Sequence, residues 1–170
     1  MTSPLDNGSR WAVLGVTVFI LSCAALVTDP ARALALINES PSLPRGIYLR
    51  RPDSQLMVGA VVATPQSAIA RAYLGALGMP GDVLLIKRVA AGPGDAVCRI
   101  GDRIRIPRRS VAVPIRDRRG AILPTWSGCR RLGAGEVFLL GDTPTSFDSR
   151  YFGPVAIADI EGVYREFVTW

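Results

Sequence analysis

The stretch that decides the fold is residues 81–97, GDVLLIKRVAAGPGDAV, an apolar run enclosed by glycine and proline. A run of this kind predicts a buried strand, here over residues 83–90. Because side chains alternate along a strand, Lys87 lies on one face and Arg88 on the other, where it can meet water. The remaining residues expected on the Lys87 face are apolar: Val83, Leu85 and Val89.

An apolar face has a chemical consequence for Lys87. Desolvation disfavours the ammonium form and lowers the pKa, which is how a lysine becomes a general base near neutral pH. The same pattern fits a lysine that reaches solvent from a strand edge or pairs with a carboxylate, and these structural roles are more common. The local pattern alone therefore leaves the role of Lys87 open.

The composition further limits which catalytic groups the protein can use. The chain has 170 residues, 49% of them hydrophobic, with 20 Lys+Arg against 14 Asp+Glu. It contains no histidine, which excludes Ser-His and Cys-His nucleophilic pairs and HExxH metal sites. Lys87 is the only lysine. If the protein performs acyl transfer, its base is therefore a carboxylate or Lys87, and we expect no cofactor and no metal site.

The N-terminal part suggests a membrane segment. Residues 1–10 are polar, and residues 11–27 carry no charge. This apolar stretch is about 25 Å long as a helix, slightly short of a hydrocarbon core of roughly 30 Å. We expect a tail over residues 1–10, a transmembrane anchor over 11–28 and one domain over 29–170. A cleavable signal peptide ending near the Ala33-Leu34-Ala35 sequence is the alternative.

The rest of the chain predicts a mainly β domain with short helices. A helix is expected over residues 67–77, with Ile69, Ala72, Tyr73, Ala76 and Leu77 on one face. Cys98 and Cys129 suffice for one disulfide in an oxidising compartment, and two buried free thiols are the alternative. The other expected strands are residues 58–63, 96–100, 103–106, 111–115 and 137–140.

Arginines concentrate in residues 99–119 and raise the question of nucleic-acid binding. Arg103 and Arg105 alternate with isoleucines, as on the solvent face of a hairpin. Aromatic residues that would stack on bases are absent from this stretch. We therefore favour a solvated face, with attraction to anionic lipid headgroups as the second interpretation, and expect no nucleic-acid partner.

Two further stretches concentrate hydroxyl groups. Residues 38–48, NESPSLPRGIY, contain two serines and two prolines, and the restricted backbone suits either a pre-set nucleophile or an ordinary turn. Residues 141–151, GDTPTSFDSRY, follow an apolar strand. There an Asp148–Arg150 pair is able to brace a loop without taking part in chemistry.

Together the three stretches resemble the S26 family of signal peptidases, which are Ser-Lys membrane proteases. In that family a serine box opens the domain, a lysine box reads like KRVxGxPGD and a third box like GDNxxxSxDSRxxG. Here residues 87–95 read KRVAAGPGD and residues 141–153 read GDTPTSFDSRYFG. The serine box, residues 38–48, is closer to the form of the TraF-type conjugative transfer peptidases, N-x-[ST]-x-S-[ML]-P-x-G-x-Y.

The resemblance implies a role for each matching residue. Ser42, chosen over Ser40 because Leu43-Pro44 follows it, is the nucleophile, and Lys87 is the general base. Ser40 and the Ser42 backbone N–H line the oxyanion hole. Thr143 departs from the usual asparagine, which puts a turn contact in doubt. The supporting residues are Ser146, which orients the lysine, and the bracing pair Asp148 and Arg150.

The same resemblance implies a signal-peptidase-like β domain in the periplasm, anchored once in the inner membrane of a bacterium. The expected substrate is a conjugative pilin precursor, or another exported peptide, with head-to-tail cyclisation as one outcome. The expected partners are the bilayer and a conjugative secretion apparatus. A general type I signal peptidase and a non-catalytic component of a secretion or conjugation apparatus are the alternatives. A LexA-like repressor is disfavoured because an anchor precedes the serine box.

Overall fold

The computed structural model describes residues 33–170, so the expected tail and anchor lie outside the described residues. Residues 34–170 form one compact unit. Within the described part, no helix is long and apolar enough to cross a bilayer. The strands are β1 Ala35–Asn38, β2 Gly46–Arg50, β3 Val61–Thr64, β4 Leu85–Ala91, β5 Ala96–Ile100, β6 Arg103–Ile106, β7 Arg109–Ala112, β8 Cys129–Arg131, β9 Glu136–Leu140, β10 Val155–Ala156 and β11 Gly162–Thr169.

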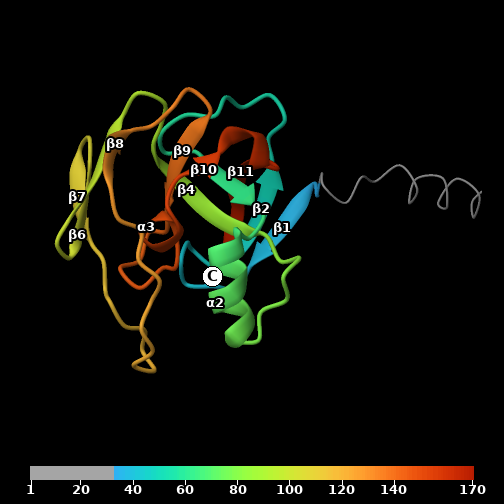
Figure 1. Ribbon diagram of the computed structural model, residues 1–170. Helices are drawn as coiled ribbons and strands as arrows, with labels where there is room; N and C mark the ends of the chain where they lie inside the picture. Colours follow the sequence, from blue (N-terminus) through green and yellow to red (C-terminus); the bar gives the residue numbers. More distant parts are fainter. Residues whose placement is uncertain (1–32) are drawn as a thin grey trace, which may run out of the picture. The chain divides into compact units, whose positions relative to one another are not determined.

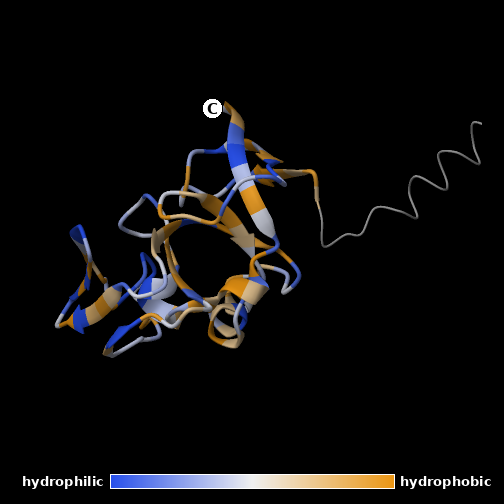
Figure 2. Cartoon of the chain, turned by 90° about the horizontal axis from the view of Figure 1, so that it is seen from above, coloured by the Kyte–Doolittle hydropathy of each residue, from blue (hydrophilic) through white to orange (hydrophobic). Residues whose placement is uncertain are grey.

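Two antiparallel sheets build the domain, which confirms the mainly β prediction. The larger has seven strands in the order β1-β2-β11-β3-β4-β9-β10, and the smaller has four in the order β7-β6-β5-β8 (Figure 1). Seen from above, the larger sheet is strongly curled, with apolar residues along its strands (Figure 2). The short helices are α2 Ala68–Ala76, α3 Ser149–Phe152 and a 3-10 turn at Ile157–Asp159.

Strand β4 lies inside the larger sheet, between β3 and β9. Six of its seven residues are buried, and only Arg88 is half-exposed. The expected strand began too early, because Val83 precedes β4 and is exposed. The neighbouring strands β3 and β9 therefore flank Lys87 on both sides within the sheet, with Val62 of β3 as its direct partner.

Two other expected strands are shifted. The strand expected from residue 58 begins at Val61, because Gly59 adopts a positive φ of 95° in a turn that needs this conformation. The strand expected over 111–115 is β7, which starts at Arg109 opposite Ile106. It ends before Pro114, which has no backbone N–H to donate.

The position of helix α2 is close to the expected one, but its buried face is not. Ser67 caps the N-terminus by accepting from the Ala70 N–H at 3.2 Å. The expected face is wrong, since Ile69 and Leu77 are exposed and the helix buries Ala70 and Leu74. Leu74 packs with Leu85 of β4. The contact with this strand, rather than the strongest apolar pattern in the helix, therefore determines which face of α2 is buried.

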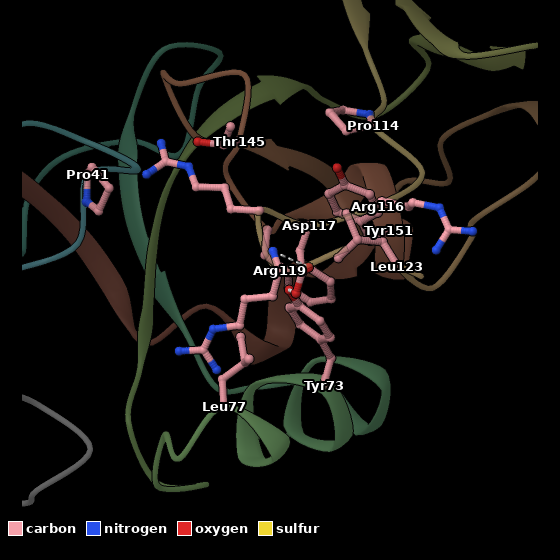
Figure 3. A pocket seen from close by; sticks show the side chains of 12 residues that line it. Pro41, Tyr73, Leu77, Pro114, Arg116, Asp117, Arg119, Leu123, Thr145 and Tyr151 are labelled. Atoms are coloured by element: carbon pink, nitrogen blue, oxygen red, sulfur yellow. Dashed lines mark hydrogen bonds between the residues drawn. The ribbon is translucent and has the colours of Figure 1, made fainter. Parts of the chain in front are cut away.

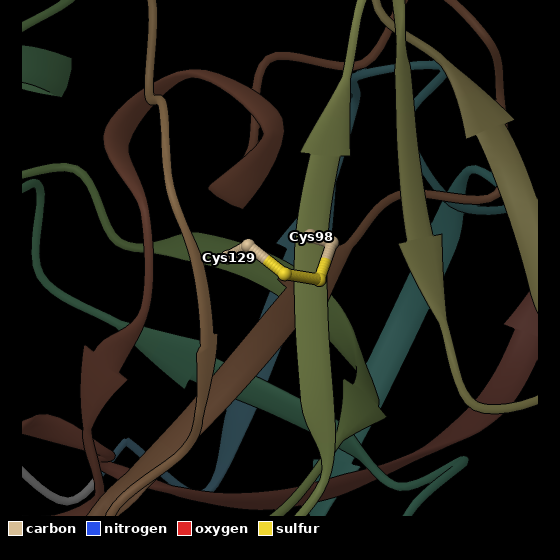
Figure 4. The surroundings of a disulfide bond; sticks show 2 residues. All are labelled: Cys98 and Cys129. Atoms are coloured by element: carbon tan, nitrogen blue, oxygen red, sulfur yellow. A yellow bond between two sulfur atoms is a disulfide. The ribbon is translucent and has the colours of Figure 1, made fainter.

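The smaller sheet shows the alternation expected of its arginines. In β6, Arg103 and Arg105 are exposed, whereas Ile104 and Ile106 are buried in the core below. At the other edge, Cys98 of β5 lies directly opposite Cys129 of β8, and the structure joins them by a disulfide (Figure 4). The solvated-face interpretation of Arg103 and Arg105 is therefore consistent with the fold.

Candidate active site

Lys87 reaches the site from the middle of β4, and its side chain is almost fully enclosed, with 4% exposed. Burial is the largest influence on the amine and lowers its pKa from 10.5 to about 8. Asp148 opposes this by favouring the charged form, and Arg150 adds to the lowering. The amine is therefore far easier to deprotonate than that of an ordinary lysine.

Ser42 lies in the loop between β1 and β2 and is buried as well. The Lys87 Nζ lies 3.0 Å from the Ser42 Oγ, although the two residues are 45 positions apart in the sequence. The Ser40 Oγ lies 2.7 Å from the Ser42 Oγ on the exposed side of the loop. The structure thus brings together three of the residues singled out in the sequence.

Asn38, the last residue of β1, organises this serine loop. Its Nδ2 donates to the backbone carbonyls of Ser40, Leu43 and Pro44 at 3.0 to 3.1 Å. Its Oδ1 accepts from the Ser40 backbone N–H at 3.2 Å and from the Ser40 hydroxyl at 3.0 Å. A single amide side chain therefore fixes the backbone on both sides of Ser42.

A second connection joins the serine loop to the strand that carries the lysine. The Ser42 carbonyl accepts from the Asp142 N–H at 2.6 Å, and the Asp142 carboxylate takes two hydrogen bonds from Arg88, at 2.9 and 3.1 Å. Gly141 has no room for a side chain, since a Cβ there would clash with the Ser146 hydroxyl and the Ser42 carbonyl. Lys87 thus contacts the serine loop directly, and its neighbour Arg88 is connected to that loop through Asp142.

Asp148 and Arg150 form a buried ion pair beneath this arrangement. Two hydrogen bonds join their side chains, at 2.8 and 2.6 Å, and 0% and 2% of their surfaces are exposed. Asp148 also accepts from the Gly141 N–H at 2.8 Å, and Arg150 donates to the carbonyls of Thr143 and Pro144 at 2.9 and 2.8 Å. The pair thereby fixes the loop that closes over Ser42.

Ser146 lies beside Gly141 but does not make the expected hydrogen bond to the lysine. It is buried, and its hydroxyl has no hydrogen-bond partner within residues 33–170. The Thr143 hydroxyl is also without a partner there, and the contact of this residue with Arg150 uses the backbone carbonyl. Exchange of asparagine for threonine at this position therefore leaves that contact intact.

The described residues contain no group of three or more histidine, cysteine, aspartate or glutamate side chains arranged to hold a metal ion. The polar groups at the site are a serine hydroxyl, a partly deprotonated amine and the hydrogen-bond donors around them. Such a set is suited to nucleophilic attack on a carbonyl carbon.

Residues 9–170 match the family described as signal peptidase, peptidase S26. This chain belongs to that family. Plasmid transfer protein TraF of Escherichia coli is 33% identical over 169 residues, which cover 92% of this chain and 94% of the relative. Conjugal transfer protein TraF of Agrobacterium fabrum is 35% identical over 168 residues, 88% of this chain and 94% of the relative.

Among solved structures, this S26 family member is similar to a signal peptidase I from Enterococcus faecalis. The two are 23% identical with a TM-score of 0.40, and the match covers 65% of this chain and 97% of the other.

Sequence reasoning about this S26 family member missed two contributors. Asn38 and Asp142 lie within the quoted boxes, but no role was expected for either. The signal for Asn38 is its position two residues before Ser40, where an Asx side chain readily bonds to the backbone two residues on. For Asp142 there is no comparable local signal, because its partner Arg88 is 54 positions away.

Proposed function

We propose that this protein is a serine endopeptidase in which Ser42 is the nucleophile and Lys87 the general base. The observation that carries the proposal is the 3.0 Å separation between the Lys87 Nζ and the Ser42 Oγ, in a setting that lowers the pKa of the amine to about 8. Near neutral pH a useful fraction of such an amine is unprotonated and able to accept a proton.

In the first step, the neutral Lys87 amine takes the hydroxyl proton of Ser42 as the Oγ attacks the scissile carbonyl carbon. The carbonyl oxygen becomes negative in the tetrahedral intermediate. Lys87 then gives its proton to the departing amine, the C–N bond breaks, and an ester joins the substrate to Ser42. Burial of the lysine supports both transfers because it keeps the pKa close to the working pH.

Donors for the developing oxyanion are the Ser40 hydroxyl and the Ser42 backbone N–H. Within residues 33–170 the Ser42 N–H donates to no protein atom, so it is available to a substrate. The Ser40 hydroxyl is held 2.7 Å from the Ser42 Oγ and 3.0 Å from the Asn38 Oδ1. Turning from Asn38 to the substrate oxygen would add a second donor, an effect of about 3 kcal/mol.

The substrate we propose is a conjugative pilin precursor, because the relatives that match most of the chain are named plasmid or conjugal transfer proteins TraF. We place the enzyme in the bacterial inner membrane, anchored by residues 11–28, with its catalytic domain in the periplasm beside a conjugation apparatus. The acyl-enzyme ends by attack of water or of the N-terminal amine of the substrate, which would give a cyclic product.

The test is the intact mass of a pilin precursor co-expressed with the wild type, Ser42→Ala or Lys87→Arg. We expect cleavage with the wild type and a loss of at least about a thousand-fold with either variant. Lys87→Arg keeps the charge, but a guanidinium stays protonated and is no base. Ser127→Ala, the same change at an exposed serine, should cleave normally.

Each outcome separates the alternatives. A product lighter by one water than the linear fragment identifies cyclisation, and the linear mass identifies hydrolysis. Processing of many unrelated exported precursors would favour a general signal peptidase. Normal processing with Ser42→Ala and Lys87→Arg would contradict the Ser-Lys mechanism and favour a non-catalytic component.

A further inference from the structure

A pocket of about 370 Å³ opens next to the nucleophile (Figure 3). Pro41, which precedes Ser42, and Thr145, which precedes Ser146, form one side of it. Loop residues 114–123 form the opposite side, and α2 contributes Tyr73. A peptide whose scissile carbonyl lies at the Ser42 Oγ would therefore pass directly over this pocket.

The floor of the pocket is aromatic. Phe147 stacks on Tyr73 at 4.4 Å and on Tyr151 at 5.1 Å between ring centroids. Such a surface favours an apolar side chain. It also lowers the local dielectric constant beside any charge at the rim, which strengthens electrostatic attraction there.

The rim is cationic, since Arg116, Arg118 and Arg119 line it against a single carboxylate, Asp117. Arg118 and Arg119 line the pocket, and neither forms an ion pair with a carboxylate within residues 33–170. In Figure 3, Arg119 extends to the side of Asp117 on which Pro41 lies, and Arg116 extends to the other side. Arg119 is thus directed toward the side of the pocket that Pro41, the residue before Ser42, contributes.

Asp117 is the one carboxylate that lines the pocket, and its oxygens accept hydrogen bonds from its own loop and from α2. It accepts from the Tyr73 hydroxyl at 3.0 Å and from the backbone N–H groups of Arg119 and Ala121 at 2.8 and 2.9 Å. These bonds fix the loop that carries Arg118 and Arg119 to α2. They leave both guanidinium groups free to bind an external anion.

We propose that Arg118 and Arg119 bind a carboxylate in the peptide segment adjoining the scissile bond, beside an apolar side chain on the aromatic floor. A carboxylate is the anionic group of an unmodified peptide, and a guanidinium pairs with it through two parallel hydrogen bonds. Its source is an acidic side chain or a free C-terminus. The proposal rests on the proposed function for the position of the scissile bond.

The test measures binding without cleavage, using the full chain with Ser42→Ala in neutral detergent micelles. Three probes are titrated by calorimetry: acetyl-alanyl-phenylalanyl-glutaminyl-alanine amide, the same peptide with glutamic acid for glutamine, and the glutamine peptide with a free C-terminal carboxylate. We expect a carboxylate to tighten binding roughly five-fold. The preferred probe identifies the source of the carboxylate.

Two double variants test whether Arg118 and Arg119 are the source of the carboxylate preference. Arg118→Gln/Arg119→Gln should abolish the preference for a carboxylate, because it removes both guanidinium groups from the pocket, whereas the Arg119 backbone N–H can still donate to Asp117. Arg103→Gln/Arg105→Gln removes the same charge from the exposed face of β6 and should retain the preference. The circular dichroism spectrum of each variant checks that it is folded.

Three results would overturn the proposal: equal affinities for the three probes, a preference that survives Arg118→Gln/Arg119→Gln, and no binding up to about 10 mM. Loss of the preference in micelles carrying anionic phosphatidylglycerol would assign the arginines to lipid headgroups and also overturn it. A carboxylate preference without any precursor cleavage would support this pocket while contradicting the proposed peptidase.

Discussion

Two arginine–carboxylate pairs in this molecule have the same shortest contact and very different surroundings. Asp148–Arg150 and Arg130–Glu136 both close to 2.6 Å. In the first, Asp148 and Arg150 are 0% and 2% exposed, whereas in the second Arg130 and Glu136 are 45% and 31% exposed. The first lies under the candidate active site, and the second lies at the edge of the smaller sheet, where β8 runs toward β9.

The comparison shows that the contact distance alone does not indicate how much an ion pair contributes to the stability of the fold. Water solvates both partners of the exposed pair whether or not they contact each other, so the pair adds little to the free energy of unfolding. The buried pair has no such substitute, and removal of one partner leaves a desolvated charge. Because Asp148 and Arg150 also hold the backbone at Gly141, Thr143 and Pro144, their loss would reach the serine loop.

The largest effect on stability should come from Asp148→Asn. This change leaves the Arg150 guanidinium buried without a counter-charge, which costs about 3–5 kcal/mol. Urea unfolding of the full chain in micelles, followed by circular dichroism, measures the loss. A loss below about 1 kcal/mol would mean that the buried pair contributes no more to stability than an exposed pair does.

The next effect concerns the buried amine that this pair adjoins. In the proposed mechanism Lys87 acts in its neutral form, and burial brings its pKa to about 8, so protonation below that pH would remove the base. Cleavage should rise roughly ten-fold per unit from pH 6 to pH 8 and then level off. A time course with purified enzyme and precursor gives the profile. A rate independent of pH over this range would contradict the role of Lys87.

A smaller effect is expected at Asn38, a positioning residue that acts through Ser40 and the loop backbone. Asn38→Ala removes its donors from three carbonyls and should cost about 2 kcal/mol of stability. It should lower kcat about ten-fold while KM changes little, since the oxyanion donor is misplaced and the binding surface is not.

Asn38→Asp is the matched variant. It keeps an acceptor for Ser40 but sets a negative oxygen against three carbonyls, so we expect it to be no better than alanine. Full activity of both variants, measured as kcat on the precursor, would show that the loop holds its shape without this side chain.

The smallest effect should be that of Glu136→Gln. The pair is exposed, and a glutamine still accepts from the Gly133 N–H, which bonds to the Glu136 carboxylate at 2.8 Å. Its shift in the urea midpoint should be a small fraction of that for Asp148→Asn. Comparable shifts for the two variants would remove the distinction between the buried and the exposed pair.

Sequence reasoning located the strand of Lys87, the alternation in β6 and the position of α2, because periodicity and turn residues are local signals. It misplaced the buried face of α2, where Leu85 of a distant strand decides which side is covered. The pairing of Ser42 with Lys87 was expected from the resemblance to the S26 family rather than from the local pattern around either residue. The roles of Asn38 and Asp142 depend on the path of the loop in space, which no local pattern encodes.

Lys87 is both buried and the single lysine of the chain, and this has a consequence for active-site titration. The chain offers an acylating reagent two kinds of amine, its α-amino group and one lysine. The lysine is enclosed by β3, β9 and the serine loop, so a reagent reaches it only through the site, and an occupied site protects it. A single added mass on Lys87 would therefore count the open sites in a preparation, without any substrate.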